Sequence, residues 1–153
     1  MNSTYDAIFW DNDGVLVDTE RLYYRATREA LAEAGLELTP ELYFRYFLES
    51  DRGTVAFATD RGLAENAAVE IRERRNTNYR ELLQNEPIAI AGVRETLETL
   101  RPRYRMGIVT SSLRSHFDTI HRRTGLLRYF DFVLAQNDYA ESKPAPDPYL
   151  AAV

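Results

Sequence analysis

The chain has no cysteine among its 153 residues, and this absence excludes thiol nucleophiles, cysteine-ligated zinc sites and disulfide bonds together. It also fits a reducing compartment. No run approaches the ~20 consecutive apolar residues of a membrane-spanning helix, and the first four residues, MNST, do not begin a basic region followed by an apolar stretch. We therefore expect a cytoplasmic protein without a membrane partner.

Basic residues are in the minority, with 19 Lys and Arg against 24 Asp and Glu and a net charge of -5. They are scattered through the chain, so we expect no nucleic-acid partner. The one basic cluster, RERR at residues 72–75, is interpreted as the solvated face of a helix. The length and the 44% of apolar residues suit one core, or one core carrying a smaller insertion.

Three short apolar runs predict a sheet: AIFW at residues 7–10, MGIV at 106–109 and FVLA at 132–135. Each run is continuously apolar rather than alternating, which is typical of parallel strands covered by helices on both faces. The predicted fold class is therefore α/β.

Helical patterning fills the region from about Thr19 to about Asn85, which is far longer than the single helix that joins two parallel strands. Gly35 would end its first helix, and Thr39 followed by Pro40 is typical of the start of the next. We predict a helical insertion over residues 19–87, and a sheet domain made of residues 1–18 and 88–153.

Asp11 and Asp13 follow the first predicted strand directly, in the segment DNDGVLVD at residues 11–18. Side chains two residues apart on an extended chain point the same way, so both carboxylates can meet at the end of the strand, where open α/β sheets bind ligands. At ~4 Å two such charges repel by about 4 kcal/mol at an effective dielectric near 20. A bound Mg²⁺, which prefers oxygen ligands, would relieve that repulsion.

The ends of the other two strands carry groups that suit phosphate. Thr110, Ser111 and Ser112 follow the second strand, and Lys143 lies in a proline-rich loop after the third. Each feature also has an ordinary explanation: the aspartates as turn formers, Thr110 as a helix N-cap and Lys143 as a surface lysine. Their order and placement together favour a phosphate site.

These segments resemble the signatures of the haloacid dehalogenase superfamily, in the branch that contains β-phosphoglucomutase and many small-metabolite phosphatases. The first, second and third signatures are similar to FWDNDGVLVDTE at residues 9–20, IVTSS at 108–112 and KPAPD at 143–147. AGVRETL at residues 91–97 resembles the segment with which that branch returns from its helical cap. The resemblance covers essentially the whole chain and implies a Rossmann-like three-layer core with an inserted α-helical cap.

The resemblance also implies roles for the matched residues. Asp11 is the expected nucleophile, and Asp13 the acid that protonates the leaving oxygen and then the base that activates water. Thr110, Ser111 and Lys143 are the expected phosphate ligands. Mg²⁺ is the expected cofactor, held by the Asp11 carboxylate and the Asp13 backbone carbonyl.

Glu20 and Arg52 are further candidates for a substrate or hinge role. Glu20 lies where the chain enters the helical insertion, and an ordinary glutamate at a helix N-terminus is the alternative. For Arg52, and for Arg61 beside it, the alternative is a surface arginine.

The family's fourth signature, which supplies the remaining metal carboxylate after a fourth strand, is not reached before Val153. We therefore expect the natural protein to be longer, the 153-residue chain alone to be inactive, and residues 7–10 to form an exposed strand edge. Such an edge would favour self-association or a partner chain.

The function predicted from the sequence is a phosphatase that hydrolyses a small phosphorylated metabolite, with the helical cap as a lid. A sugar phosphomutase of the same branch is the nearest alternative. A phospho-accepting receiver module is an alternative of another class, but its accepting aspartate follows a later strand and it has no large helical insertion.

Overall fold

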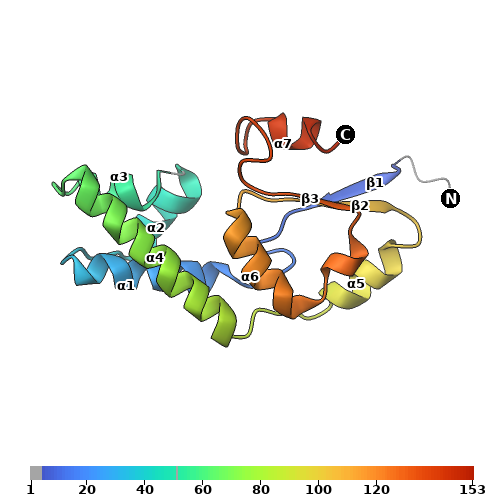
Figure 1. The fold of residues 1–153 in the computed structure, drawn as a ribbon, viewed down its shortest axis with the longest axis horizontal. Helices are drawn as coiled ribbons and strands as arrows, with labels where there is room; N and C mark the ends of the chain where they lie inside the picture. Colours follow the sequence, from blue (N-terminus) through green and yellow to red (C-terminus); the bar gives the residue numbers. More distant parts are fainter. Residues whose placement is uncertain (1–4, 51) are drawn as a thin grey trace. The chain divides into compact units, whose positions relative to one another are not determined.

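The computed structural model describes residues 5–50 and 52–153 and divides into two compact units (Figure 1). One unit consists of the chain up to Thr19 and from Pro87 onward, and contains the sheet. The other consists of Glu20–Glu86 and is helical. Each unit has its own hydrophobic cluster.

The sheet has the order β1-β2-β3, and both strand pairs are parallel. Its strands are β1 (Ala7–Trp10), β2 (Arg105–Val109) and β3 (Phe132–Leu134), which confirms the predicted parallel α/β arrangement. Trp10 pairs with Ile108, and Val109 pairs with Leu134. The three strands therefore end at nearly the same level, and the loops that follow them meet at one edge of the sheet.

Helices lie on both sides of this sheet, with α5 (Val93–Leu100) and α6 (Arg114–Thr124) on one side and the short α7 (Asp147–Leu150) on the other (Figure 1). The expectation of strands covered on both faces holds for β2 but is wrong for β1 and β3, which contain no buried residue because they are the outer strands of this sheet. A 3₁₀ turn, Leu127–Tyr129, joins α6 to β3. The buried cluster of this unit is Leu16, Leu97, Met106, Ile108, Phe117, Leu126 and Tyr129. Burial of each large apolar side chain contributes roughly 1.5–3 kcal/mol.

The centre of the sheet depends on the absence of a side chain at Gly107. Gly107 is paired with Phe132, and a Cβ at position 107 would lie 2.2 Å from Cζ of the Phe132 ring. The ring also packs edge to face against Phe9, with centroids 5.8 Å apart. Phe132 thus takes the space above β2 that a side chain at position 107 would otherwise fill.

The helical unit contains α1 (Glu20–Glu33), α2 (Pro40–Tyr43), a π-helical segment (Phe44–Glu49), α3 (Gly53–Thr59) and α4 (Glu65–Asn85). Gly35 follows α1 with a positive φ of 75°, as expected of a residue that ends a helix. The Thr39 hydroxyl accepts a hydrogen bond from the Leu42 amide at 3.3 Å, which confirms the predicted N-cap before Pro40. Long helices α1 and α4 pack along each other.

The interpretation of residues 72–75 as a solvated face is wrong for Arg75. Arg72 and Arg74 are exposed, but Arg75 is buried, with its guanidinium 4.4 Å from the centroid of the Tyr23 ring. It also donates to the Tyr23 hydroxyl and, at 3.0 Å, to Asn76 Oδ1. Burial is tolerated because the planar guanidinium stacks on an aromatic face and its N–H groups find neutral acceptors.

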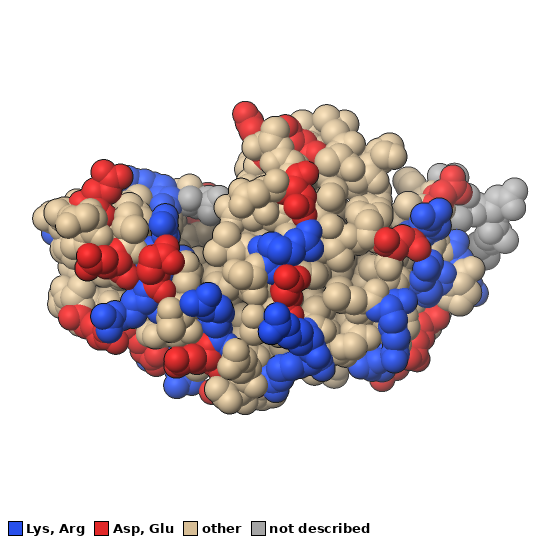
Figure 2. All heavy atoms as spheres, viewed as in Figure 1, with Lys and Arg blue, Asp and Glu red and all other residues tan. Residues whose placement is uncertain are grey.

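Acidic and basic side chains are interspersed on the face of the molecule drawn in Figure 2. In the part of the chain that the structure describes, no helix combines the length and the apolar character needed to cross a membrane.

Candidate active site

A tight turn around Asn12 follows β1 and carries the two candidate carboxylates. The Asn12 carbonyl accepts from the amides of residues 15–17 at 3.2, 2.8 and 3.2 Å, and Gly14 takes a positive φ of 74°. Asn12 itself is fully buried, whereas Asp11 is exposed and Asp13 is half-buried. The turn thus anchors its central residue in the protein interior and presents the carboxylates on either side of it.

Asp11 meets Lys143, which comes from the loop after β3. Lys143 Nζ lies 3.0 Å from Asp11 Oδ1 and donates to the Val109 carbonyl at 3.2 Å. The same Asp11 oxygen accepts from the Asn12 amide at 2.8 Å. The Asp11 side chain remains 47% exposed, so its second oxygen is available to a reactant.

Asp13 is surrounded by hydrogen-bond donors. Its Oδ1 accepts from the Thr19 hydroxyl at 2.6 Å, and its Oδ2 accepts from the Ser112 hydroxyl and from Asn12 Nδ2 at 3.2 Å. Hydrogen bonds to an ionised acceptor are stronger than those between neutral groups. Three side chains therefore hold the Asp13 carboxylate in one orientation.

Thr110 is not an N-cap, because α6 begins at Arg114 and is preceded by Leu113. Its buried hydroxyl accepts from the Ser112 amide at 3.1 Å, and its carbonyl accepts from the Tyr139 hydroxyl at 2.8 Å. Ser111 is exposed, whereas the Ser112 hydroxyl bonds to Asp13. The resemblance implied Thr110 and Ser111 as phosphate ligands, whereas the contact of Ser112 with Asp13 depends on the folded turn after β2.

The loop between β3 and Lys143 is anchored by Asp138. Its Oδ2 accepts from the Ala135 amide at 2.8 Å, and its carboxylate pairs with Arg114. The Ala135 amide, and then Arg114, lower the pKa of Asp138, so this anchor stays charged. Sequence reasoning missed Asp138 and Tyr139, because neither lies in a signature segment.

His121 is a buried group that sequence reasoning also missed. Nε2 of His121 lies 2.7 Å from Asn12 Oδ1, and Nδ1 lies 2.9 Å from the Thr124 hydroxyl. Burial lowers the pKa of His121 from its ordinary value of 6.5 to about 4, against the opposing charges of Asp13 and Asp118. The ring is therefore neutral near pH 7.

The two candidates in the helical unit have partners within that unit. The Glu20 carboxylate accepts from the buried Tyr43 hydroxyl. Arg52 pairs with both carboxylate oxygens of Asp60, at 2.6 and 3.2 Å, and lies over the Tyr46 ring. These contacts lie within the helical unit, so a structural role there is enough to explain the positions of both side chains.

The donor set near Asp11 suits a hydrated magnesium ion. Among residues 5–50 and 52–153, no group of three or more His, Asp or Glu side chains would hold a metal ion by itself. Mg²⁺ is, however, usually bound by one or two carboxylates together with water and substrate phosphate. The exposed Asp11 carboxylate is a donor of that kind.

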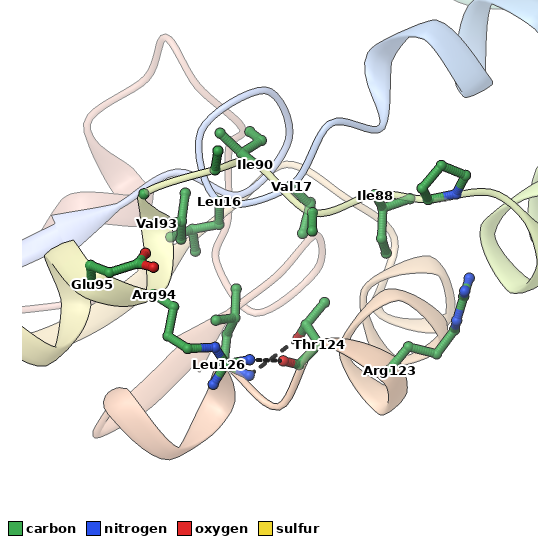
Figure 3. A pocket seen from close by; sticks show the side chains of 14 residues that line it. Leu16, Val17, Ile88, Ile90, Val93, Arg94, Glu95, Arg123, Thr124 and Leu126 are labelled. Carbon is green, nitrogen blue, oxygen red and sulfur yellow. Dashed lines mark hydrogen bonds between the residues drawn. The ribbon is translucent and has the colours of Figure 1, made fainter.

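A separate cavity of about 430 Å³ lies in the same unit, between the turn after β1, the segment before α5 and the end of α6 (Figure 3). Leu16, Val17, Ile88 and Ile90 are among its apolar lining, and Arg94 donates to the Thr124 carbonyl at its rim at 3.0 Å. None of the candidate residues Asp11, Asp13, Thr110 or Lys143 lines it.

Comparison with known proteins identifies relatives over nearly the whole chain. The family model described as haloacid dehalogenase-like hydrolase matches residues 8–153. The phosphorylated carbohydrates phosphatase of Thermotoga maritima is 30% identical over 150 residues, which are 95% of this chain and 68% of that protein. The fructose-1-phosphate phosphatase YqaB of Escherichia coli is 27% identical over 157 residues, with 98% of this chain and 79% of YqaB covered.

Solved structures show the same fold. CbbY of Rhodobacter sphaeroides, in complex with phosphate, matches with a TM-score of 0.78 at 24% identity, over 97% of this chain and 71% of CbbY. YfnB of Bacillus subtilis, bound to magnesium, matches with a TM-score of 0.69 at 17% identity, over 98% of this chain and 73% of YfnB. From the family match and the 30% identical relative together, the chain belongs to the haloacid dehalogenase-like hydrolase family.

Proposed function

We propose that this protein is a magnesium-dependent phosphatase that hydrolyses a small phosphorylated metabolite through an aspartyl-phosphate on Asp11. The observation that carries the proposal is the 3.0 Å approach of Lys143 Nζ to Asp11 Oδ1, because it joins a cation and a half-exposed carboxylate from the ends of two different strands. The names of the two phosphatase relatives, one for phosphorylated carbohydrates and one for fructose 1-phosphate, support a sugar phosphate as the substrate class.

In the first half-reaction, the Asp11 carboxylate attacks phosphorus and forms the acyl-phosphate bond while the bond to the leaving oxygen breaks. Asp13 gives its proton to that oxygen, which departs as an alcohol. Lys143 and the hydroxyls of Thr110 and Ser111 bind the phosphoryl oxygens on which negative charge accumulates.

In the second half-reaction, Asp13 accepts a proton from water as the water attacks the phosphorus. The bond between phosphorus and Asp11 breaks, and inorganic phosphate leaves. One side chain thus acts first as an acid and then as a base, and the free enzyme is restored.

Mg²⁺ would be held by the Asp11 carboxylate and the Asp13 backbone carbonyl, and when bound it supplies positive charge to the phosphate oxygens. Lys143 cannot replace it fully, since the single lysine charge already pairs with Asp11 and a phosphate dianion adds further negative charge. Residues 20–86 are the proposed cap, which would exclude bulk water and select the substrate. Its Glu20 and Arg52 are proposed to contribute to the hinge or to substrate contacts.

Two isosteric substitutions test these roles in the complete gene product. Asp11→Asn should lower kcat/KM by at least about a thousandfold, because the amide keeps the shape but is not a nucleophile. Asp13→Asn should lower kcat/KM for a sugar phosphate more than for p-nitrophenyl phosphate, whose leaving oxygen needs little protonation. Asp11→Asn activity within about tenfold of wild type would exclude Asp11 as the nucleophile.

A binding measurement supports the kinetic one. BeF₃⁻ with Mg²⁺ imitates a phosphoryl group on an aspartate, so it should raise the melting temperature of the wild-type protein but not that of Asp11→Ala. The reaction product separates hydrolysis from the phosphomutase alternative: free inorganic phosphate indicates a phosphatase, and an isomeric sugar phosphate indicates a mutase.

A further inference from the structure

A continuous line of hydrogen bonds connects the end of α6 to Asp13. The Leu126 amide donates to the Thr124 hydroxyl oxygen at 3.2 Å, and this oxygen lies 2.9 Å from His121 Nδ1. On its other side His121 approaches Asn12 Oδ1 at 2.7 Å, and Asn12 Nδ2 donates to Asp13 Oδ2 at 3.2 Å. His121 and Asn12 are both buried and 109 residues apart in sequence.

The chemistry of the two ends determines the direction of every bond in the line. Asp13 Oδ2 as a carboxylate only accepts, so Asn12 must turn its NH₂ group toward Asp13 and its carbonyl oxygen toward His121. That oxygen accepts as well, so His121 carries its hydrogen on Nε2. In a neutral ring Nδ1 is then an acceptor, and it takes the hydrogen of the Thr124 hydroxyl.

All four donors therefore point toward Asp13. Successive hydrogen bonds with one direction polarise each other, so each donor is stronger than it would be alone. The neutral state of His121 that this arrangement needs agrees with its lowered pKa near 4, which follows from its burial. A protonated ring would place an N–H against the Thr124 hydroxyl and reverse that bond.

We infer that His121 is a positioning residue for Asp13: it fixes the Asn12 amide, and thereby stabilises the Asp13 carboxylate that remains once its proton has gone to the leaving oxygen. The inference rests on the proposed acid role of Asp13. It adds residues outside every signature segment, His121 and Thr124, to the machinery of the first half-reaction. Thr124 also lines the cavity of Figure 3, where Arg94 holds its carbonyl.

The effect should depend on the leaving group. An alcohol needs the Asp13 proton, so loss of the line should slow its departure; p-nitrophenolate needs little protonation, so its departure should be nearly unaffected. A purely structural role of His121 would slow both substrates equally. The readout is the single-turnover rate of phosphoryl transfer at saturating enzyme, which separates this step from binding.

The variants are His121→Leu, His121→Gln and Thr124→Val, with Thr119→Val as the matched control. Thr119 lies in the same helix, and its hydroxyl donates to the Ser115 carbonyl rather than to the line. The substrates are p-nitrophenyl phosphate and the sugar phosphate that the wild-type complete protein turns over fastest. Thr124→Val retains a buried His121, so it tests the inference even if His121→Leu does not fold.

We expect His121→Leu to slow transfer from the sugar phosphate about tenfold, because the Asn12 amide that donates to Asp13 loses its hydrogen bond from the ring. Transfer from p-nitrophenyl phosphate should slow less than about threefold. His121→Gln, which retains an N–H donor, should recover most of the loss. Thr124→Val should show a smaller loss with the same selectivity for the sugar phosphate, and Thr119→Val none.

Equal slowing of both substrates by His121→Leu and Thr124→Val, or no slowing by either, would overturn the inference. Failure of the proposed function would give a different result. The wild-type protein would then lack phosphatase activity, or the Asp11→Asn variant would retain it, and the inference would fail together with the proposed function. BeF₃⁻ protection that persists in Thr124→Val confirms that the Asp11 site is intact while the line is altered.

Discussion

The buried His121 ring should make folding stability depend on pH in a way that one substitution removes. In the folded protein its pKa is about 4, compared with 6.5 when the ring is exposed in the unfolded chain. Between these values the unfolded state binds a proton that the folded state does not. Stability therefore falls as the pH is lowered from about 6.5 to about 4 and does not change further through this group below that.

The size of the effect follows from the pKa difference. Each pKa unit corresponds to 1.36 kcal/mol, so a shift from 6.5 to about 4 limits the loss to about 3 kcal/mol. The loss is large compared with a typical free energy of unfolding of 5–15 kcal/mol. Acidic residues that do not interact with the ring contribute equally to wild type and to a His121 variant, whereas Asp13 and Asp118 interact with it and oppose part of the effect of burial.

The comparison is wild type against His121→Gln, which cannot titrate in this range. Urea unfolding at a series of pH values from about 7 to about 4 gives the free energy of each protein. The free energy of unfolding of wild type minus that of His121→Gln should fall by about 2–3 kcal/mol as the pH is lowered over that interval. If the free energies of unfolding of the two proteins change in parallel with pH, or if their difference grows in acid, His121 is not a neutral buried ring in the folded protein.

Two further predictions concern packing. Gly107→Ala should lower the free energy of unfolding by about 1–3 kcal/mol, because the new methyl group overlaps the Phe132 ring, and Phe132→Leu in the same chain should recover part of it in chemical unfolding. Thr54→Val should raise stability by about 1 kcal/mol, since the buried Thr54 hydroxyl has no hydrogen-bond partner among the described residues; an unchanged or lower melting temperature would contradict this.

Local pattern was sufficient for much of the fold. The three apolar runs specified the three parallel strands, although only the central one, β2, is buried. Gly35 and the pair Thr39 and Pro40 specified helix ends because their backbone preferences act over a few residues. Asp11 and Asp13 could be placed at the sheet edge because they follow a strand directly, although their catalytic roles stay predictions.

The sequence did not reveal which side chains surround the candidate residues in the folded protein. Ser111 and Ser112 are adjacent and chemically identical, and only the turn after β2 turns the second hydroxyl toward Asp13. Arg75 looked like part of a solvated charge cluster, and only the packing of α1 against α4 provides the Tyr23 ring that covers it.

What the sequence by itself determined are features whose physical cause is local: the positions of the strands, the helix ends and the spacing of Asp11 and Asp13. What only the tertiary structure decided is which distant groups meet. The bond between His121 and Asn12 spans 109 residues, and it depends on the position of α6 on one side of the sheet (Figure 1). A buried polar group must find its partner wherever the folded chain brings one, so its partner cannot be deduced from its sequence neighbours.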